Sequence, residues 1–145
     1  MKRAHALFMA GSAGLVLAGL LHMLGQFKGG APTDPQLQAV EASMRSYLFS
    51  GLGMQFTVMD VMQCWGIYFG LLAVFAGVQG LLVAGTAAAR PALLQRLAFV
   101  HMLGVAVLIG VAVYFRIAPP IIVFSTVFIF FAASWVLSLL RGAGR

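Results

Sequence analysis

The sequence predicts an all-α polytopic membrane protein: a bundle of four transmembrane helices with a short amphipathic helix in its first outer loop. The chain has 145 residues, of which 62% are hydrophobic and only 8% are charged, values outside the range of soluble globular proteins. About 20 apolar residues cross roughly 30 Å of hydrocarbon. Four windows reach that length, at residues 4–25, 57–84, 97–117 and 120–140. Since only residues 26–56 leave a long connection, we expect one domain, 1–145.

The positions of the basic residues predict the orientation of these windows. Arginine and lysine gather before the first window, between the second and third, and after the fourth, as Lys2, Arg3, Arg90, Arg96, Arg141 and Arg145. The positive-inside rule places such residues in the cytoplasm. We therefore expect both termini inside and the loop 26–56 outside. The net charge of +6 is then a signal of topology, and we expect no nucleic-acid partner.

The first window has a second interpretation as a cleaved signal peptide, with Gly29 and Ala31 as small residues of a cleavage site. The apolar region of a signal peptide is about 7–15 residues long. This window approaches full spanning length and carries the polar residues His22 and Gln26 near its end. We therefore expect it to be a retained helix.

The outer loop 26–56 carries the signals of a helix start. Asp34 is placed to cap a helix, and Pro35 follows in the first helical position, where its missing N–H costs nothing. Apolar residues then recur at helical spacing, as Leu37, Val40, Met44 and Leu48. Gly51 and Gly53 are expected to end this helix. A lid over the helix ends is favoured over a helix that binds a partner.

Small residues predict how the first two windows pack. Ala10, Gly14 and Ala18 repeat every four residues in the first window, and Gly66 and Gly70 do so in the second. Small residues at this spacing let helices approach closely in lipid, so these two windows should pack tightly. His22 and Gln26 continue the stripe after Ala18 and should face protein. Cys64, in the second window, is expected to be a small buried side chain.

Polar residues of the windows fall into two layers of depth. The outer cluster comprises His22, Gln26, Asp60, Gln63, Tyr114 and Arg116, and the inner pair comprises Gln79 and His101. At 1.5 Å per residue, His22 and His101 differ in depth by about 15 Å, which excludes a haem bound by both histidines. One histidine and one aspartate fall short of a metal-ligand set. We therefore expect neither cofactor nor metal.

The outer cluster has two interpretations. In the structural one, which is favoured, His22, Asp60 and Arg116 neutralise one another, or Asp60 serves as a first-turn residue stabilised by the helix dipole. In the functional one, His22 and Asp60 are a catalytic acid–base pair and Arg116 holds an anionic group. The expected ligand-binding residues are Gln26, Gln63, Tyr114 and Arg116. For His101, a buried hydrogen bond with Gln79 is favoured.

Five short motifs resemble a family of small uncharacterised bacterial four-helix integral membrane proteins, grouped as a domain of unknown function. They are His22 in HMLGQ, MRSYLF at 44–49, Asp60 after Met59, GIYFG at 66–70 and VYFRIAPP at 113–120. The resemblance implies the four-helix fold and a place in the bacterial cytoplasmic (inner) membrane, but no established activity. Two residues depart from the family pattern. Met59 replaces an aromatic residue, which puts an aromatic-walled pocket in doubt, and Gln26 replaces a second histidine, which puts a metal pair in doubt.

Three classes of function stay open. The first is binding of a small or lipid-like ligand in an outer-face polar pocket. The second is a membrane-embedded enzyme that uses His22 and Asp60 for proton transfer on a lipid or isoprenoid-like substrate. The third is an accessory or scaffold subunit of a membrane complex. A small multidrug transporter is disfavoured, because the first window lacks a mid-membrane carboxylate. The expected partners are the lipid bilayer and a lipid-like molecule, with a homo-oligomer or a membrane-complex partner left open.

Overall fold

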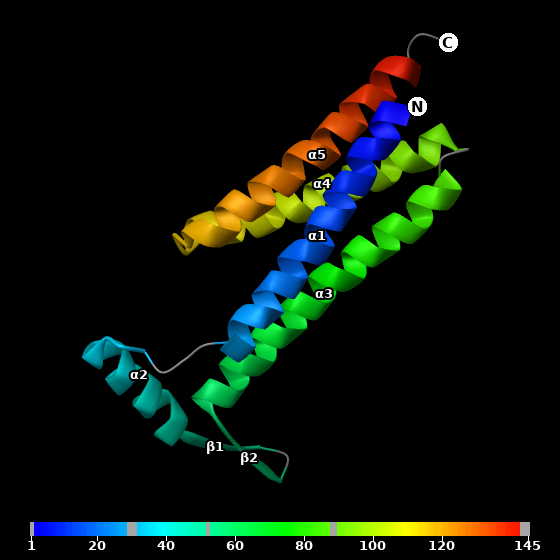
Figure 1. Cartoon of the computed structure of the whole chain (residues 1–145). Helices are drawn as coiled ribbons and strands as arrows, with labels where there is room; N and C mark the ends of the chain where they lie inside the picture. Colours follow the sequence, from blue (N-terminus) through cyan, green and yellow to red (C-terminus); the bar gives the residue numbers. More distant parts are fainter. Residues whose placement is uncertain (1, 29–31, 52, 88–89, 143–145) are drawn as a thin grey trace. The chain divides into compact units, whose positions relative to one another are not determined.

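A computed structural model describes residues 2–28, 32–51, 53–87 and 90–142 and confirms the predicted all-α fold (Figure 1). Four helices in this part of the chain are long and apolar enough to cross a membrane: α1 (Lys2–Lys28), α3 (Val58–Ala87), α4 (Pro91–Tyr114) and α5 (Ala118–Gly142). The protein is therefore a multi-pass membrane protein. Between α1 and α3 lie α2 (Pro35–Ser46) and the strands β1 (Leu48–Gly51) and β2 (Met54–Thr57).

The chain forms two compact units, and α1 and α3 contribute to both. The first unit comprises Met1–Ala18 and Ala73–Arg145, and the second comprises Gly19–Leu72. In the first unit, α4 and α5 lie side by side as an antiparallel pair. The first part of α1 packs against α5, where a Cβ on Gly11 would lie 3.0 Å from the Phe131 ring. The Ser134 hydroxyl of α5 donates a hydrogen bond to the Ala4 carbonyl of α1 at 2.7 Å. Such bonds join helices where water is absent.

In the first unit, the contact of α3 with α1 follows a row of small residues. Ala73, Gly77, Gly80 and Ala84 are buried, and they alternate spacings of four and three residues. A Cβ on Gly77 would lie 2.5 Å from the Ser12 carbonyl oxygen. This mean repeat of 3.5 residues keeps one face of a helix against its neighbour, as in a left-handed coiled coil. The His5 ring also donates from Nε2 to the Ala84 carbonyl at 2.8 Å, so α1 and α3 run antiparallel.

In the second unit, the predicted close packing of the first two spans is confirmed. A Cβ on Gly70 would lie 3.0 Å from the carbonyl oxygen of Gly19, and one on Gly66 would lie 2.6 Å from the Gln26 side chain. The prediction that Ala10, Gly14 and Ala18 mediate this contact is partly wrong, because Gly14 faces Val127 of α5. The residues of α1 that face α3 instead follow a heptad spacing, with Ser12 and Val16 in the first unit and Gly19, Met23 and Gln26 in the second.

The predicted start of the loop helix is confirmed. Asp34 caps α2 by accepting a hydrogen bond from the Gln36 backbone at 2.8 Å, and Pro35 is the first helical residue. The interpretation of α2 as a lid does not fit the structure, since none of its residues is buried. Cys64 is likewise exposed rather than buried.

The residues after α2 differ from the prediction. Leu48, expected in the helix, begins β1, and β1 pairs with β2 as an antiparallel hairpin in which Phe49 lies opposite Phe56. Gly53 has a φ of +79°, a left-handed conformation that glycine adopts without a steric cost. The helix ends at Ser46, before Gly51 and Gly53. Apolar and polar residues alternate from Met54 to Thr57, a pattern that suits a strand.

Candidate functional site

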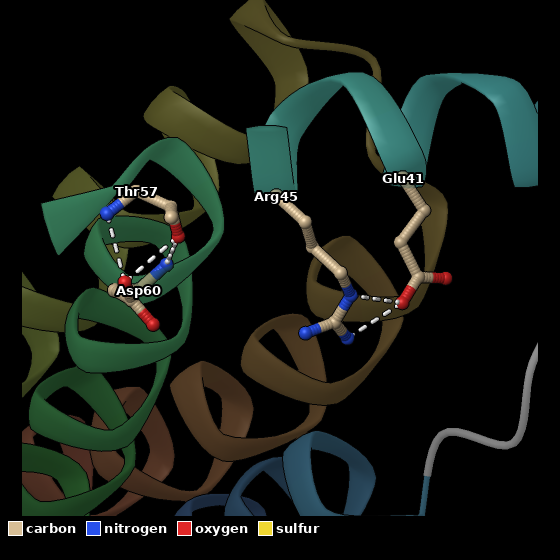
Figure 2. A network of polar contacts seen from close by, with 4 residues as sticks. All are labelled: Glu41, Arg45, Thr57 and Asp60. Carbon is tan, nitrogen blue, oxygen red and sulfur yellow. Dashed lines mark hydrogen bonds and ion pairs between the residues drawn. The ribbon is translucent and has the colours of Figure 1, made fainter. Parts of the chain in front are cut away.

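Asp60 holds the start of α3. Its Oδ2 accepts hydrogen bonds from the Thr57 backbone N–H at 2.7 Å and from the Thr57 hydroxyl at 2.8 Å (Figure 2). The Thr57 hydroxyl oxygen in turn accepts from the Asp60 backbone N–H at 3.1 Å. This reciprocal arrangement is a capping box, and it satisfies backbone donors that a helix leaves free at its first turn. The Asp60 carboxylate thus has a structural partner in Thr57, and the side chain is exposed.

His22 lies on α1, and its ring makes a T-shaped contact with that of Phe69 of α3, at a centroid distance of 5.1 Å and an interplanar angle of 73°. Its Nε2 is buried and has no hydrogen-bond partner within the described part of the chain. A buried polar group left unsatisfied costs about 1–3 kcal/mol, and hydrocarbon supplies no replacement partner. The free Nε2 therefore indicates a position where a polar group from outside the chain could bind.

The structure does not bring His22 and Asp60 together. Asp60 precedes Phe69, the neighbour of His22, by about nine residues, or about 13 Å along the helix axis. Among the residues that the structure describes, the one ion pair joins Glu41 and Arg45 of α2 at 2.6 Å, also drawn in Figure 2. The prediction that His22 and Asp60 lie at the same depth assumed that α1 ends at the level where α3 begins. Because Gln26 near the end of α1 already lies beside Gly66, α3 extends beyond α1 and carries Asp60 with it.

The two glutamines of the outer cluster occupy neighbouring helices. Gln26 is half-buried one turn after His22, and its side chain covers Gly66 where a Cβ would otherwise stand. It faces protein, as the sequence predicted. Gln63 is half-buried about one turn before Gly66 on α3. His22 and Gln26 thus form the polar end of the contact between α1 and α3.

Tyr114 and Arg116 belong to the first unit, at the end of α4. Tyr114 is exposed and its ring contacts that of Phe115 at a centroid distance of 5.0 Å. Arg116 is exposed in the turn to α5, with a φ of +57°. The Arg116 N–H donates to the Val113 carbonyl at 3.0 Å, and the Ile117 N–H donates to that of Ala112 at 2.9 Å. These bonds form a Schellman motif, which ends α4 at Tyr114, three residues before the end of the predicted window.

The left-handed conformation of Arg116 gives a testable expectation. Glycine is preferred at this position of a Schellman motif, because a Cβ disfavours it. We expect Arg116→Gly to raise the free energy of unfolding by about 0.5–1 kcal/mol, as measured by detergent-induced unfolding in micelles. Arg116→Ala removes the same charge but keeps the Cβ and should give no such gain. Equal stability of the two variants would show that the left-handed backbone at residue 116 is not strained by a Cβ.

His101 has a different partner from the one predicted. Gln79 is exposed, whereas Nδ1–H of His101 donates to the Leu97 carbonyl at 2.9 Å, one turn earlier on α4. The ring packs against Phe8 and Phe131 at centroid distances of 5.4 and 5.0 Å. The inner histidine is therefore held in an aromatic core.

Sequence reasoning missed Ser12, which is fully buried on α1. Its hydroxyl lies where a Cβ on Gly80 would stand, and that Cβ would also lie 3.5 Å from Nε2 of His101. The hydroxyl has no hydrogen-bond partner within the described ranges. Ser12 lies between Gly11 and Ala13, so in the sequence it looks like one more small residue at a helix contact, and no pattern predicted a buried hydroxyl there. Among the described residues, no group of three histidine, cysteine or acidic side chains is arranged to hold a metal ion.

Comparison with family models, with curated proteins and with solved structures finds no match for this chain. The resemblance to a family of four-helix membrane proteins therefore stays a prediction.

Proposed function

We propose that the protein is a multi-pass protein of the bacterial inner membrane that binds a small or lipid-like ligand through His22, where α1 and α3 meet in the second unit. The observation that carries the proposal is the buried Nε2 of His22, which no residue of the described chain satisfies. Buried polar groups in proteins are nearly always paired, so an orphan ring nitrogen favours a missing partner. A polar head group at the edge of the hydrocarbon could supply it.

Orientation is part of the proposal. Both termini would be cytoplasmic, because Lys2 and Arg3 begin α1 while Arg90 and Arg96 lie at the start of α4. The end of α1 that carries His22, the start of α3 and the loop between them would then face the outer side.

The neighbouring side chains favour a ligand with a polar head and an apolar body. Imidazole can accept or donate one hydrogen bond, and the Gln26 amide one turn away on α1 offers both functions. The surface of α1 around them is apolar, with Leu21, Leu24 and Phe27 exposed by 58%, 49% and 72%. A lipid or isoprenoid-like molecule would match this combination better than a fully polar solute.

The enzyme alternative has less support. Proton transfer on one substrate by His22 and Asp60 requires the two side chains to face one site, whereas the Asp60 carboxylate caps α3 through Thr57. The accessory-subunit alternative is compatible with ligand binding.

The test compares His22→Phe with His22→Gln by native mass spectrometry of full-length protein purified in a mild detergent. Loss of one hydrogen bond of about 1.4 kcal/mol should reduce the co-purified ligand about tenfold in His22→Phe. His22→Gln keeps a hydrogen-bonding group and should retain more. In ligand-free protein, His22→Phe should unfold at the same or a higher temperature than the wild type, because it removes a buried nitrogen that the described residues leave unsatisfied. A species bound equally by all three proteins, or none bound by any, would overturn the proposal.

Asp60→Asn distinguishes ligand binding from the enzyme alternative. It should leave the bound species unchanged and lower the free energy of unfolding by about 0.3–1 kcal/mol, because Asn can accept the same hydrogen bonds but lacks the negative charge that the start of a helix favours. Loss of the ligand in a folded Asp60→Asn protein would instead favour a site shared by His22 and Asp60.

A further inference from the structure

The β-hairpin between α2 and α3 presents an aromatic face. Side chains alternate across a strand, so the opposed pair Phe49 and Phe56 shares one face with Met54, which lies opposite Gly51. The two phenylalanine rings lie 5.6 Å apart, and Tyr47 extends the row with a ring distance of 5.0 Å to Phe49. The other face carries the pairs Leu48–Thr57 and Ser50–Gln55.

This face is largely uncovered in the chain alone. Tyr47 and Met54 are exposed by 61% and 62%, and Phe49 by 37%. A two-stranded hairpin is marginally stable in water unless a further surface covers its apolar side. The aromatic row therefore requires a partner surface.

Helix α2 carries a second uncovered apolar stripe. Leu37, Val40 and Met44 follow the i, i+3, i+7 spacing of one helix face, and Leu37 and Val40 are each exposed by 55%. Ala42 lies on the opposite face. The apolar and polar sides of α2 are separated, which is typical of segments that lie in a lipid–water interface. In the hairpin, the face opposite the aromatic row carries three polar residues and Leu48.

The chain ties both segments to the membrane boundary. Thr57, the last residue of β2, directly precedes Val58, with which α3 and its membrane span begin. The capping box of Thr57 and Asp60 holds this junction. On the other side, the span of α1 ends at Phe27 and α2 begins at Pro35, so the connection can reach at most about 25 Å. The hairpin face is thus continuous along the chain with the surface that meets lipid.

We propose that the aromatic face of the hairpin and the apolar stripe of α2 insert into the lipid–water interface on the side where α1 ends and α3 begins. The segment is a membrane-surface anchor, and its occupant is lipid. Aromatic residues such as tyrosine are enriched at this depth. Insertion depends on apolar contact and not on charge, because Asp34 and Glu41 balance Lys28 and Arg45. The inference does not depend on a ligand at His22.

The test measures the depth of single labels in the full-length protein. Cys64→Ala removes the native thiol, and cysteine is then placed at Met54 or at Gln55, adjacent exposed residues on opposite faces of β2. The cysteine is labelled with an environment-sensitive fluorophore, and the protein is placed in nanodiscs of phosphatidylcholine with or without brominated acyl chains. We expect blue-shifted emission and at least about threefold stronger quenching at position 54 than at 55.

A matched pair on α2, Val40→Cys and Ala42→Cys, should repeat this contrast. Equal, weak quenching at both members of each pair would overturn the proposal. Blue-shifted emission without quenching would show that protein, such as a second copy of the chain, covers the face, and would also overturn it. Quenching that appears only after anionic lipid is added would contradict insertion by apolar contact.

Discussion

Replacing Gly77 by alanine is expected to lower the free energy of unfolding by about 1–3 kcal/mol, and replacing it by leucine should prevent α1 and α3 from packing. A Cβ at this position would lie 2.5 Å from the Ser12 carbonyl oxygen and 2.8 Å from the Val16 backbone nitrogen. Both are backbone atoms of a helix, so no rotamer change can relieve the clash. The helices would have to separate, and the hydrogen bonds that depend on their approach, such as the partly buried one from His5 to Ala84, would weaken.

Gly85→Ala is the matched control, because Gly85 lies on the same helix and a Cβ added there would have nothing within 4 Å. Alanine there should be neutral or stabilising by up to about 1 kcal/mol, from its higher helix propensity. Both variants can be compared by far-ultraviolet circular dichroism during unfolding from mild into denaturing detergent. Similar stability of Gly77→Ala and Gly85→Ala would contradict the close approach of the two helices.

Phe131→Ala is expected to cost about 3–5 kcal/mol, since a large buried aromatic side chain leaves a cavity that a packed core fills only in part. Phe131 of α5 is fully buried. Its ring contacts those of Phe8 and His101 at centroid distances of 5.5 and 5.0 Å and covers Gly11. Its removal therefore loosens α1, α4 and α5 together.

Ile129→Ala on the same helix is the control for Phe131→Ala. Ile129 is exposed by 64%, and its truncation should change stability by less than about 0.5 kcal/mol in micelles. The two variants can be compared through the midpoint of thermal unfolding. A loss in Ile129→Ala as large as that in Phe131→Ala would show that the core of the first unit is not centred on Phe131.

The four spans were predictable because each is a local property of composition. Their ends were less so: α4 begins at Pro91, about six residues before the predicted window, because proline is well suited to the first helical position. The cap at Asp34 and Pro35 was predictable for the same local reason. The hairpin was not, since the apolar residues before it also satisfied a helical spacing.

The packing of α1 on α3 was predictable in part. The pair Gly66 and Gly70 marked the contact correctly. Gly77 and Gly80 were missed because they are three residues apart, in a row of small residues whose spacing alternates between four and three, and the predicted pattern was a small residue at every fourth position. Gly14 belonged to another contact, against α5. Which neighbour a small residue meets depends on the rotation of each helix, and that rotation is set by packing around the whole helix.

The sequence by itself thus determined that the chain crosses a membrane with four helices, where its first loop helix starts, and which end of α1 and α3 carries polar side chains. The tertiary structure decided the partners of those side chains. Asp60 binds Thr57, and His101 binds the Leu97 carbonyl. His22 lies beside Phe69, and its Nε2 has no hydrogen-bond partner among the described residues. The reason is that partners depend on how far one helix is shifted along its neighbour. Long-range contacts set that shift, and a single helix carries no record of it.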